Sequence, residues 1–361
     1  MAYLPHAGAP LFSGTIRSPA RRSGWNVAPD AGSVGVLLIF ASGVLRYRRT
    51  RKTPLLWASL AIGLWCCAYR SASAAVDANG NELPETAAEG DEQTKLAKQL
   101  ANPIASLISV PFQANEDFGY GPTGDGYKFT LNIQPVVPLS ISKDWNLIVR
   151  TIVPIVSQHD LFYVKDLPPG VNITQNRSQD GLSDTSQSFF FSAKQPGPFG
   201  LIWGLGPVFL YPTGTHPFLG TGTFSIGPTA VALRQIGGIT AGALVNQLWS
   251  VIEEKNRGPV NQFFLQPFFA YTTKTHTTFT LGSEISANWI AASEDRWTVP
   301  VVVGISQILK IGKQPISLQI GGKYYAESPR NGPDWGVRFT FTLLYPTTRP
   351  QSGPVTNTYT K

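Results

Sequence analysis

The sequence contains very little cysteine and no long apolar run. Its only cysteines, Cys66 and Cys67, are adjacent, so a disulfide framework is excluded. Paired cysteines at zinc spacing, a two-histidine helical motif and an EF-hand loop are all missing from the sequence, so neither a metal site nor a cofactor is expected. The longest apolar run, 54–68, is shorter than the roughly 20 residues of a transmembrane helix.

The net charge of +7 belongs to the start of the chain. Nine of the 29 basic residues but only one of the 22 acidic residues precede Ala75, which leaves 20 basic and 21 acidic residues after that point. A basic surface for nucleic acid is therefore not expected, and we predict no nucleic-acid partner.

Residues 44–74 have the three parts of a secretory signal peptide. A cationic run at 46–52 precedes the apolar run, and the small residues 72–74 follow it. We expect cleavage before Ala75 and export across an inner membrane. A lone transmembrane anchor would need a longer apolar run, and bulky Trp65 before Cys66 disfavours a lipoprotein site.

The regions before and after the signal peptide have different interpretations. Residues 1–43 precede it and are interpreted as a non-native extension from a wrongly assigned start, because a signal peptide normally begins the chain. Residues 75–105 are predicted to be a periplasmic linker and a short helix. The acidic, apolar-poor stretch 76–93 suits a mobile linker. Beyond it, apolar residues recur at helical spacing, and Pro103 limits the helix to about two turns; these residues are Leu96, Leu100, Ile104 and Leu107.

Residues 106–346 consist of segments with alternating polarity separated by turn residues. This pattern is typical of an all-β fold, a transmembrane antiparallel β-barrel with one row of side chains toward lipid and the other toward the lumen. In 127–133, for example, Tyr127 and Phe129 alternate with Lys128 and Thr130. A soluble β-sandwich also alternates, but its strands are usually shorter. About 12 strands are expected, opening near Leu107, Tyr127, Asp144, Leu182, Leu201, Thr223, Ile239, Asn261, Thr277, Trp297, Ile316 and Trp335.

The predicted connections alternate between long and short, as in bacterial barrels with long outer loops and short periplasmic turns. The long connections are 117–126, 158–181, 211–222, 252–259, 291–296 and 327–334, and the short ones are 142–143, 195–198, 237–238, 274–275 and 312–314. An even number of strands then places a flexible C-terminal tail, 347–361, on the same side as the N-terminus. Seven prolines fall within predicted strands, where each removes a ladder hydrogen bond, so bulges or shorter strands must accommodate them; they are Pro111, Pro135, Pro154, Pro207, Pro228, Pro267 and Pro300.

Several segments resemble one known family. They are LANPIASLISVPFQ (100–113), LNIQPVVP (131–138), DWNLI (144–148), GPTAVAL (227–233), FLQPF (264–268), YTTKT (271–275) and LKIGKQP (309–315). Together they resemble proteobacterial outer-membrane proteins of the phenol-degradation meta-pathway transporter type, some of which carry a neuromedin U label. The resemblance covers nearly all of 96–346 and implies a transporter without an agreed substrate or agreed binding residues.

Alternation places a set of polar and charged side chains in the lumen, where they could select solutes by charge. The alternative is that they only pair with one another or stay hydrated. Basic residues outnumber acidic ones in this set, which predicts a mild preference for anions. The candidates are Lys128, Asn132, Gln134, Arg150, Asp184, Gln266, Glu284, Gln319, Lys323 and Arg338.

An enzyme is not predicted. His159 and His216 lie in expected outer loops without a serine nucleophile motif, and His276 lacks the serine that an outer-membrane phospholipase would have two residues on. We expect a channel or transporter in the bacterial outer membrane that passes small solutes by diffusion, with aromatic or other hydrophobic compounds as candidates. The alternatives are a non-conducting structural or adhesive barrel and, less favoured, a lipid hydrolase. Expected partners are outer-membrane lipids and the barrel-assembly machinery.

Overall fold

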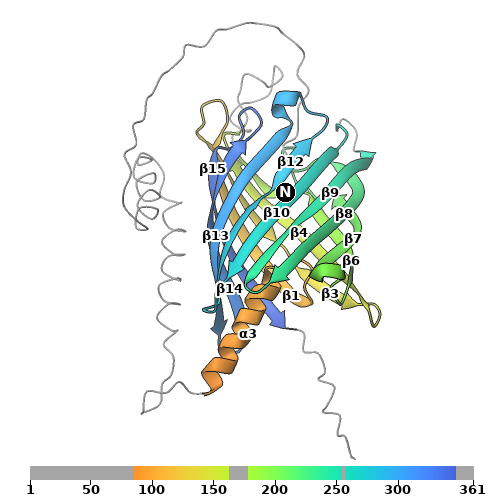
Figure 1. Ribbon diagram of the computed structural model, residues 1–361. Coiled ribbons are helices and arrows are strands. Elements are labelled where there is room, and N and C mark those ends of the chain that lie inside the picture. The colour runs from red at the N-terminus through yellow and green to blue at the C-terminus, as the bar shows by residue number, and fades with distance from the viewer. Residues whose placement is uncertain (1–83, 162–177, 254–256, 347–361) are drawn as a thin grey trace, which may run out of the picture. The chain divides into compact units, whose positions relative to one another are not determined.

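The computed structural model describes residues 84–161, 178–253 and 257–346 (Figure 1). The predicted extension, signal peptide and C-terminal tail lie outside these ranges. The described residues form helix α3 (Pro84–Leu100), the 3-10 helices η3 (Pro198–Gly200) and η4 (Ser293–Asp295), and one sheet. The sheet consists of β1 (Leu107–Tyr120), β2 (Gly126–Ile133), β3 (Val136–Ser140), β4 (Trp145–His159), β5 (Ser178–Leu182), β6 (Thr185–Ala193), β7 (Leu201–Tyr211), β8 (Thr223–Ile236), β9 (Ile239–Glu253), β10 (Asn261–Thr272), β11 (Thr277–Ser283), β12 (Ile285–Asn288), β13 (Trp297–Ile311), β14 (Gln314–Glu327) and β15 (Trp335–Pro346). Over the described ranges, no helix has the length and apolar character needed to cross a membrane.

The sheet closes on itself. β1 pairs antiparallel with β2 on one side and with β15 on the other, from Leu107 opposite Pro346 to Phe118 opposite Trp335. Three pairs of consecutive elements are halves of one strand, because both halves face the same neighbour: β2 and β3 face β4, β5 and β6 also face β4, and β11 and β12 face β10. The predicted 12-stranded antiparallel barrel is therefore confirmed.

Each of the three strand breaks lies at or opposite a proline. Pro135 lies between β2 and β3, and Pro267 of β10 lies opposite Ser283, next to the break between β11 and β12. The break between β5 and β6 lies opposite Pro154 of β4, whose carbonyl accepts from the Ser183 N–H. Proline has no N–H, so one ladder hydrogen bond is missing at each of these positions. Pro300 is accommodated by a bulge after Val299, whereas the ladder continues past Pro111 and Pro207.

Long and short connections alternate along the barrel, as predicted. One end has the connections 121–125, 212–222, 289–296 and 328–334, and the other has 141–144, 194–200, 237–238, 273–276 and 312–313; the predicted connections 158–181 and 252–259 lie partly outside the described residues. The predicted start of the first long connection at Asp117 is wrong, because β1 continues to Tyr120. Asp117 is therefore a strand residue with a defined face.

The two faces of each strand differ as the alternation predicts. Lys128 and Thr130 of β2 are buried in the barrel, whereas Phe279 and Val337 point outward and are about half exposed. Exposed aromatic side chains lie near strand ends on the outer surface, where interfacial girdles of membrane barrels occur; they are Trp145, Trp249, Tyr271, Trp289, Trp335 and Tyr345.

Helix α3 is longer than predicted. The expectation of a mobile linker as far as Gln93 is wrong from Pro84 onward, because the helix begins there and has 17 residues. Proline suits the first turn of a helix, where its missing N–H removes no hydrogen bond. Leu96 and Leu100 lie on this helix, but Ile104 lies in the turn after it and Leu107 opens β1.

Candidate functional site in the barrel lumen

The barrel encloses a cavity of about 490 Å³. Its outer end is lined by residues of the long connections, including Asp295 and Pro333, and its inner end by the turn after α3, including Ala101 and Pro103. Nine of the ten predicted lumen residues line it: Lys128, Asn132, Gln134, Arg150, Gln266, Glu284, Gln319, Lys323 and Arg338. The lumen therefore contains a cavity with polar and apolar lining that extends from the outer connections to the turn after α3.

Strand register arranges part of this lining in three inward rows on β14, β15, β1 and β2. In the outermost row Lys128 lies opposite Asp117, which lies opposite Gly336, which lies opposite Lys323. The next row toward the inner end joins Thr130, Asn115, Arg338 and Gly321, and the third joins Asn132, Gln113, Thr340 and Gln319. Four adjacent strands thus form one polar wall.

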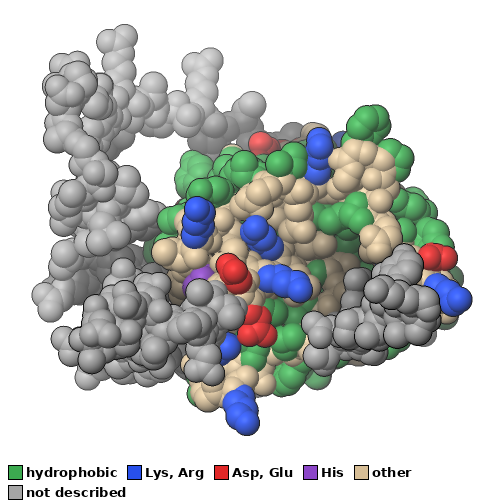
Figure 2. Space-filling view, turned by 60° about the horizontal axis from the view of Figure 1, so that its bottom comes forward, with side chains coloured by type: hydrophobic (Ala, Val, Ile, Leu, Met, Phe, Trp, Pro, Cys, Tyr) green, Lys and Arg blue, Asp and Glu red, His purple; other side chains and the backbone are tan. Residues whose placement is uncertain are grey.

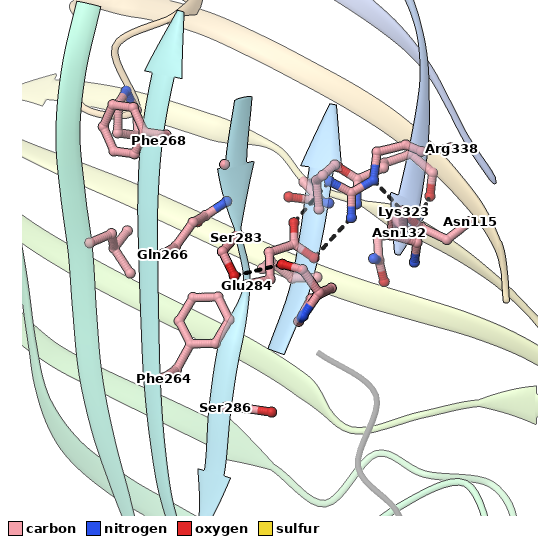
Figure 3. A pocket seen from close by; sticks show the side chains of 18 of the residues that line it. Asn115, Asn132, Phe264, Gln266, Phe268, Ser283, Glu284, Ser286, Lys323 and Arg338 are labelled. Atoms are coloured by element: carbon pink, nitrogen blue, oxygen red, sulfur yellow. Dashed lines mark hydrogen bonds and ion pairs between the residues drawn. The ribbon is translucent and has the colours of Figure 1, made fainter. Parts of the chain in front are cut away.

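Arg338 links this wall to the strand formed by β11 and β12, three strands away from β15 around the barrel. Its guanidinium Nη1 and Nη2 donate to the two carboxylate oxygens of Glu284 at 2.9 and 2.8 Å, and its Nε donates to Asn115 Oδ1 at 2.7 Å. Glu284 lies at the break between β11 and β12, so this bidentate bridge crosses from β15 to another part of the barrel (Figure 3). Such a pair is stronger and more directional than a single hydrogen bond.

A second ion pair joins Lys323 Nζ to Asp117 Oδ1 at 2.5 Å. Gly336 lies between them in the row, and a Cβ atom there would come within 2.2 Å of Asp117 Oδ1 and 3.1 Å of Lys323 Cε. The ion pair therefore occupies space that only glycine leaves open. Lys323 Nζ also lies 3.4 Å from the Tyr325 hydroxyl, which accepts from it.

Three cationic groups in the cavity lack a carboxylate partner among the described residues: Lys128, Arg150 and Arg296, the last of which lies over the Trp289 ring. Arg150 donates to Gln134 Oε1 at 3.0 Å and forms no ion pair there. Lys128 is only 4% exposed and forms neither an ion pair nor a hydrogen bond with described residues. Five basic and three acidic residues line the cavity, so its fixed charge is positive.

The aromatic side chains Phe264 and Phe268 of β10 add apolar surface to the lumen. Both line the cavity and lie on the same face of β10 as Gln266, which is between them in the sequence (Figure 3). The polar and charged side chains of Lys323, Arg338 and Asn115 lie on another part of the wall. The cavity can therefore contact a charged group and an apolar body in one solute.

The inner part of the lumen is filled by an apolar cluster. Ile104, from the turn after α3, packs with side chains of β4, β6, β8 and β9, and Phe264 and Phe268 border the same cluster. Its buried members are Ile104, Ile148, Phe190, Val231, Leu233 and Leu244. The turn after α3 thus forms the inner floor of the cavity.

Helix α3 contacts the barrel at the end with the short turns. Leu96 and Ala97 pack against Ile308 of β13 and Leu344 of β15. Polar contacts add to this packing: Thr94 Oγ1 lies 2.7 Å from His276 Nδ1, Gln235 donates to the Lys98 carbonyl at 2.8 Å, and Lys310 lies 3.6 Å from Glu92. Figure 2 turns this end toward the viewer and shows basic and acidic side chains gathered on it. Burial lowers the pKa of His276, and the Asp91 carboxylate opposes that shift.

At the outer end, two long connections are joined across the mouth. Arg330 donates from Nε and Nη2 to the carboxylate of Asp295 at 2.5–3.0 Å, and its backbone N–H donates to the same group at 2.9 Å. Hydrogen bonding to Asp295 raises the pKa of Arg330. This pair ties 289–296 to 328–334.

Asp184, the tenth predicted lumen residue, is placed elsewhere. It is buried, but it does not line the cavity, and its carboxylate accepts from the backbone N–H groups of Gly214 and Thr221 and from the Thr221 hydroxyl. Alternation alone could not show this, because the strand is interrupted at this residue. Asp184 organises the connection between β7 and β8.

The histidines have local structural contacts. His159 Nδ1 lies 2.6 Å from the Asp160 carboxylate and its ring stacks on Tyr127, and His216 Nδ1 accepts from the Phe218 N–H. Among the described residues, no serine hydroxyl is hydrogen-bonded to either ring, although Ser178 lies opposite His159 in the ladder, and no three His, Cys, Asp or Glu side chains are close enough to hold a metal ion.

Four of the lining residues that the sequence interpretation did not single out are Asn115, Asp117, Phe264 and Phe268. Asn115 and Asp117 follow Gln113 at alternate positions of β1, which signals an inward row, but the predicted connection began at Asp117. Phe264 and Phe268 alternate along β10 with Gln266 and lie on the same face of the strand. Because apolar side chains in a membrane barrel are expected to face lipid, their inward direction was not predicted.

No protein-family model and no curated protein matches the chain. Among solved structures, it is similar to the COG4313 outer membrane channel from Pseudomonas putida F1, with a TM-score of 0.51 and 11% identity over 66% of this chain and 96% of that one. The chain has an outer-membrane β-barrel fold. Weaker likenesses to this outer-membrane barrel are the transport unit of the autotransporter AIDA-I from Escherichia coli (TM-score 0.37, 12% identity, 74% and 100% covered) and the outer membrane phospholipase of Salmonella typhi (0.35, 11%, 69% and 98%).

Proposed function

We propose that this chain is an outer-membrane channel through which small solutes diffuse passively. The observation that carries the proposal is the cavity, with polar and apolar lining, that reaches from the outer connections to the turn after α3 inside a closed barrel. A 12-stranded barrel falls between 8-stranded barrels filled by side chains and wide 16-stranded porins. Solutes would therefore pass a narrow, chemically selective path.

The proposal also covers how the protein would be exported, which lipids would surround it and how it would be inserted into the membrane. Residues 44–74 would be a cleaved signal peptide, outer-membrane lipids would contact the outward apolar rows, and the barrel-assembly machinery would insert the chain. The likeness to the COG4313 channel and the resemblance to phenol-degradation meta-pathway transporters both favour membership of an outer-membrane channel family. Phe264 and Phe268 favour solutes with an aromatic or other hydrophobic part.

A non-conducting structural barrel is the second candidate. The Arg338–Glu284 bridge spans part of the lumen, and Ile104 with its apolar neighbours fills the inner part. Both features narrow the path, and a permanently closed barrel would contain them too.

Two measurements on refolded mature protein separate these candidates. We expect discrete current steps in planar bilayers in KCl and swelling of liposomes in isotonic solutions of small solutes. The control is liposomes that contain a refolded eight-stranded barrel. Neither current nor swelling above that control would favour the structural barrel, and hydrolysis of phospholipid by the purified protein would favour an enzyme.

A further inference from the structure

One buried cation of the lumen, Lys128, forms no close ion pair and no hydrogen bond within the described structure. The row Lys128, Asp117, Gly336 and Lys323 contains two ammonium groups and one carboxylate. Lys323 forms an ion pair with that carboxylate, and its Nζ lies 2.5 Å from Asp117 Oδ1. Lys128 lies directly opposite Asp117 in the ladder, yet it forms no ion pair and no hydrogen bond with any described residue.

The burial of Lys128 makes this arrangement costly. Its side chain lines the cavity and the residue is only 4% exposed. A charge removed from bulk water costs free energy unless an opposite charge or hydrogen bonds replace the lost solvation. The Asp117 carboxylate acts on the Lys128 charge electrostatically but is paired with Lys323, so an anion bound in the cavity would supply the contact that Lys128 lacks.

Further unsatisfied groups lie on the same polar wall. Asn132, four residues along β2 from Lys128, and Thr340, two strands away in the third row, each have a buried side-chain oxygen without a hydrogen-bond partner. A hydroxyl can donate, and the amide of Asn132 offers either its oxygen or its nitrogen according to its orientation. Groups of this kind commonly fix the orientation of a ligand.

The rest of the cavity fits an apolar body. Phe264 and Phe268 line it from β10, and its volume of about 490 Å³ is within the usual range of roughly 300–1,000 Å³ for small-molecule sites. The excess of basic over acidic lining residues also favours an anion.

We propose that the lumen contains a binding site for small aromatic or aliphatic monocarboxylates, with the carboxylate at the Lys128 ammonium and the apolar body toward Phe264 and Phe268. This rests on the proposed function, since it names the solute class that the channel would take. Thr340 and Asn132 would contact polar substituents of the solute.

Equilibrium dialysis of refolded mature protein in detergent tests the site without any need for conduction. The probe is radiolabelled benzoate, with benzamide as its neutral analogue of nearly equal shape. We expect benzoate to bind at least tenfold more tightly than benzamide, as a charge-assisted contact warrants. The variant Lys128→Gln should lose this preference and bind benzoate about 10- to 100-fold more weakly.

The matched control is Lys143→Gln, which removes the same charge from an exposed turn at the inner end. It should bind benzoate as the unchanged protein does. Lys128→Gln removes an unpaired buried charge, so the variant should refold, which heat-modifiable migration in gels would verify. Equal benzoate affinity of Lys128→Gln and Lys143→Gln, equal binding of benzoate and benzamide, or no benzoate binding would each overturn the proposal.

Liposome swelling then separates this inference from the proposed function. Benzoate binding that depends on Lys128 without swelling or current would keep the binding site and reject the channel. Current that is unaffected by Lys128→Gln, together with benzoate binding that does not depend on Lys128, would keep the channel and reject the site.

Discussion

At the residue scale, Gly336 is required by the ion pair on either side of it. A methyl group at this position would overlap Asp117 Oδ1 and press on Lys323 Cε. We predict that Gly336→Ala lowers the free energy of unfolding by about 1–3 kcal/mol, the usual cost of overpacking. Urea titrations of protein refolded into lipid vesicles would measure it. Gly258→Ala, where a Cβ meets no atom within 4 Å, is the control and should be nearly neutral.

Glu284 and Arg338 should affect ion selectivity in opposite directions. Glu284→Gln removes a negative charge from the lumen and leaves Arg338 without its carboxylate, so anion preference should rise. Arg338→Gln removes the positive charge and should shift the preference toward cations. Reversal potentials in a KCl gradient measure both, and shifts of the same sign in the two variants would contradict the prediction.

The same bridge should contribute to stability. Breaking a buried pair by removal of one partner costs about 3–5 kcal/mol, but Glu284 is 28% exposed, so we expect about 1–3 kcal/mol for Glu284→Gln. A double-mutant cycle with Arg338→Gln in vesicle-refolding titrations would isolate the pair energy. Additive effects of the two substitutions would show that the bridge adds no stability.

At the scale of elements, the contact of α3 with the barrel should depend on pH. Docking buries His276 and lowers its pKa from the ordinary 6.5, because a charged imidazolium would lose solvation; Asp91 reduces this effect. His276 thus takes up a proton more readily when α3 is released than when it is docked. Docking is fully favoured above pH 6.5 and weakens as the pH falls through the lowered pKa.

A spin label at Lys95→Cys can follow this release, since Lys95 is exposed and both native cysteines precede Ala75. Label mobility should increase between pH 7 and pH 5. The effect should be absent in His276→Gln and retained in the control His216→Gln, which changes an outer connection. A mobility change that persists in His276→Gln would assign the effect to another group.

The outward faces of the strands make a separate prediction. Val303 is 45% exposed at the middle of β13, so Val303→Arg should cost about 2–4 kcal/mol in a bilayer, as expected for arginine near the midplane. Refolding titrations in phospholipid vesicles would measure the loss. Ala292→Arg in an outer connection is the control, and an equal loss in both variants would indicate that Val303 does not face lipid.

At the scale of the whole molecule, the features that can be predicted from the sequence are those set by residues close to one another in the chain. Strand starts such as Leu201 and Trp297 were predicted correctly because local alternation and turn residues set them. Helix α3 was underestimated, since its stability includes packing of Leu96 on Ile308, more than 200 residues away. The bridge from Arg338 to Glu284 could not be predicted either, because it depends on which strands lie near each other around the closed lumen.

The pairing of β1 with β15 also determines the order in which the strand pairs of the barrel can form. Every other neighbouring pair of strands is joined by a single connection, so those hairpins can form as soon as both segments are available. This pair must wait for residues 335–346, the last part of the described chain. Until then two strand edges remain open, and exposed edges promote aggregation. The final twelve residues of the sheet, Trp335–Pro346, therefore cover the last two open edges and complete the barrel.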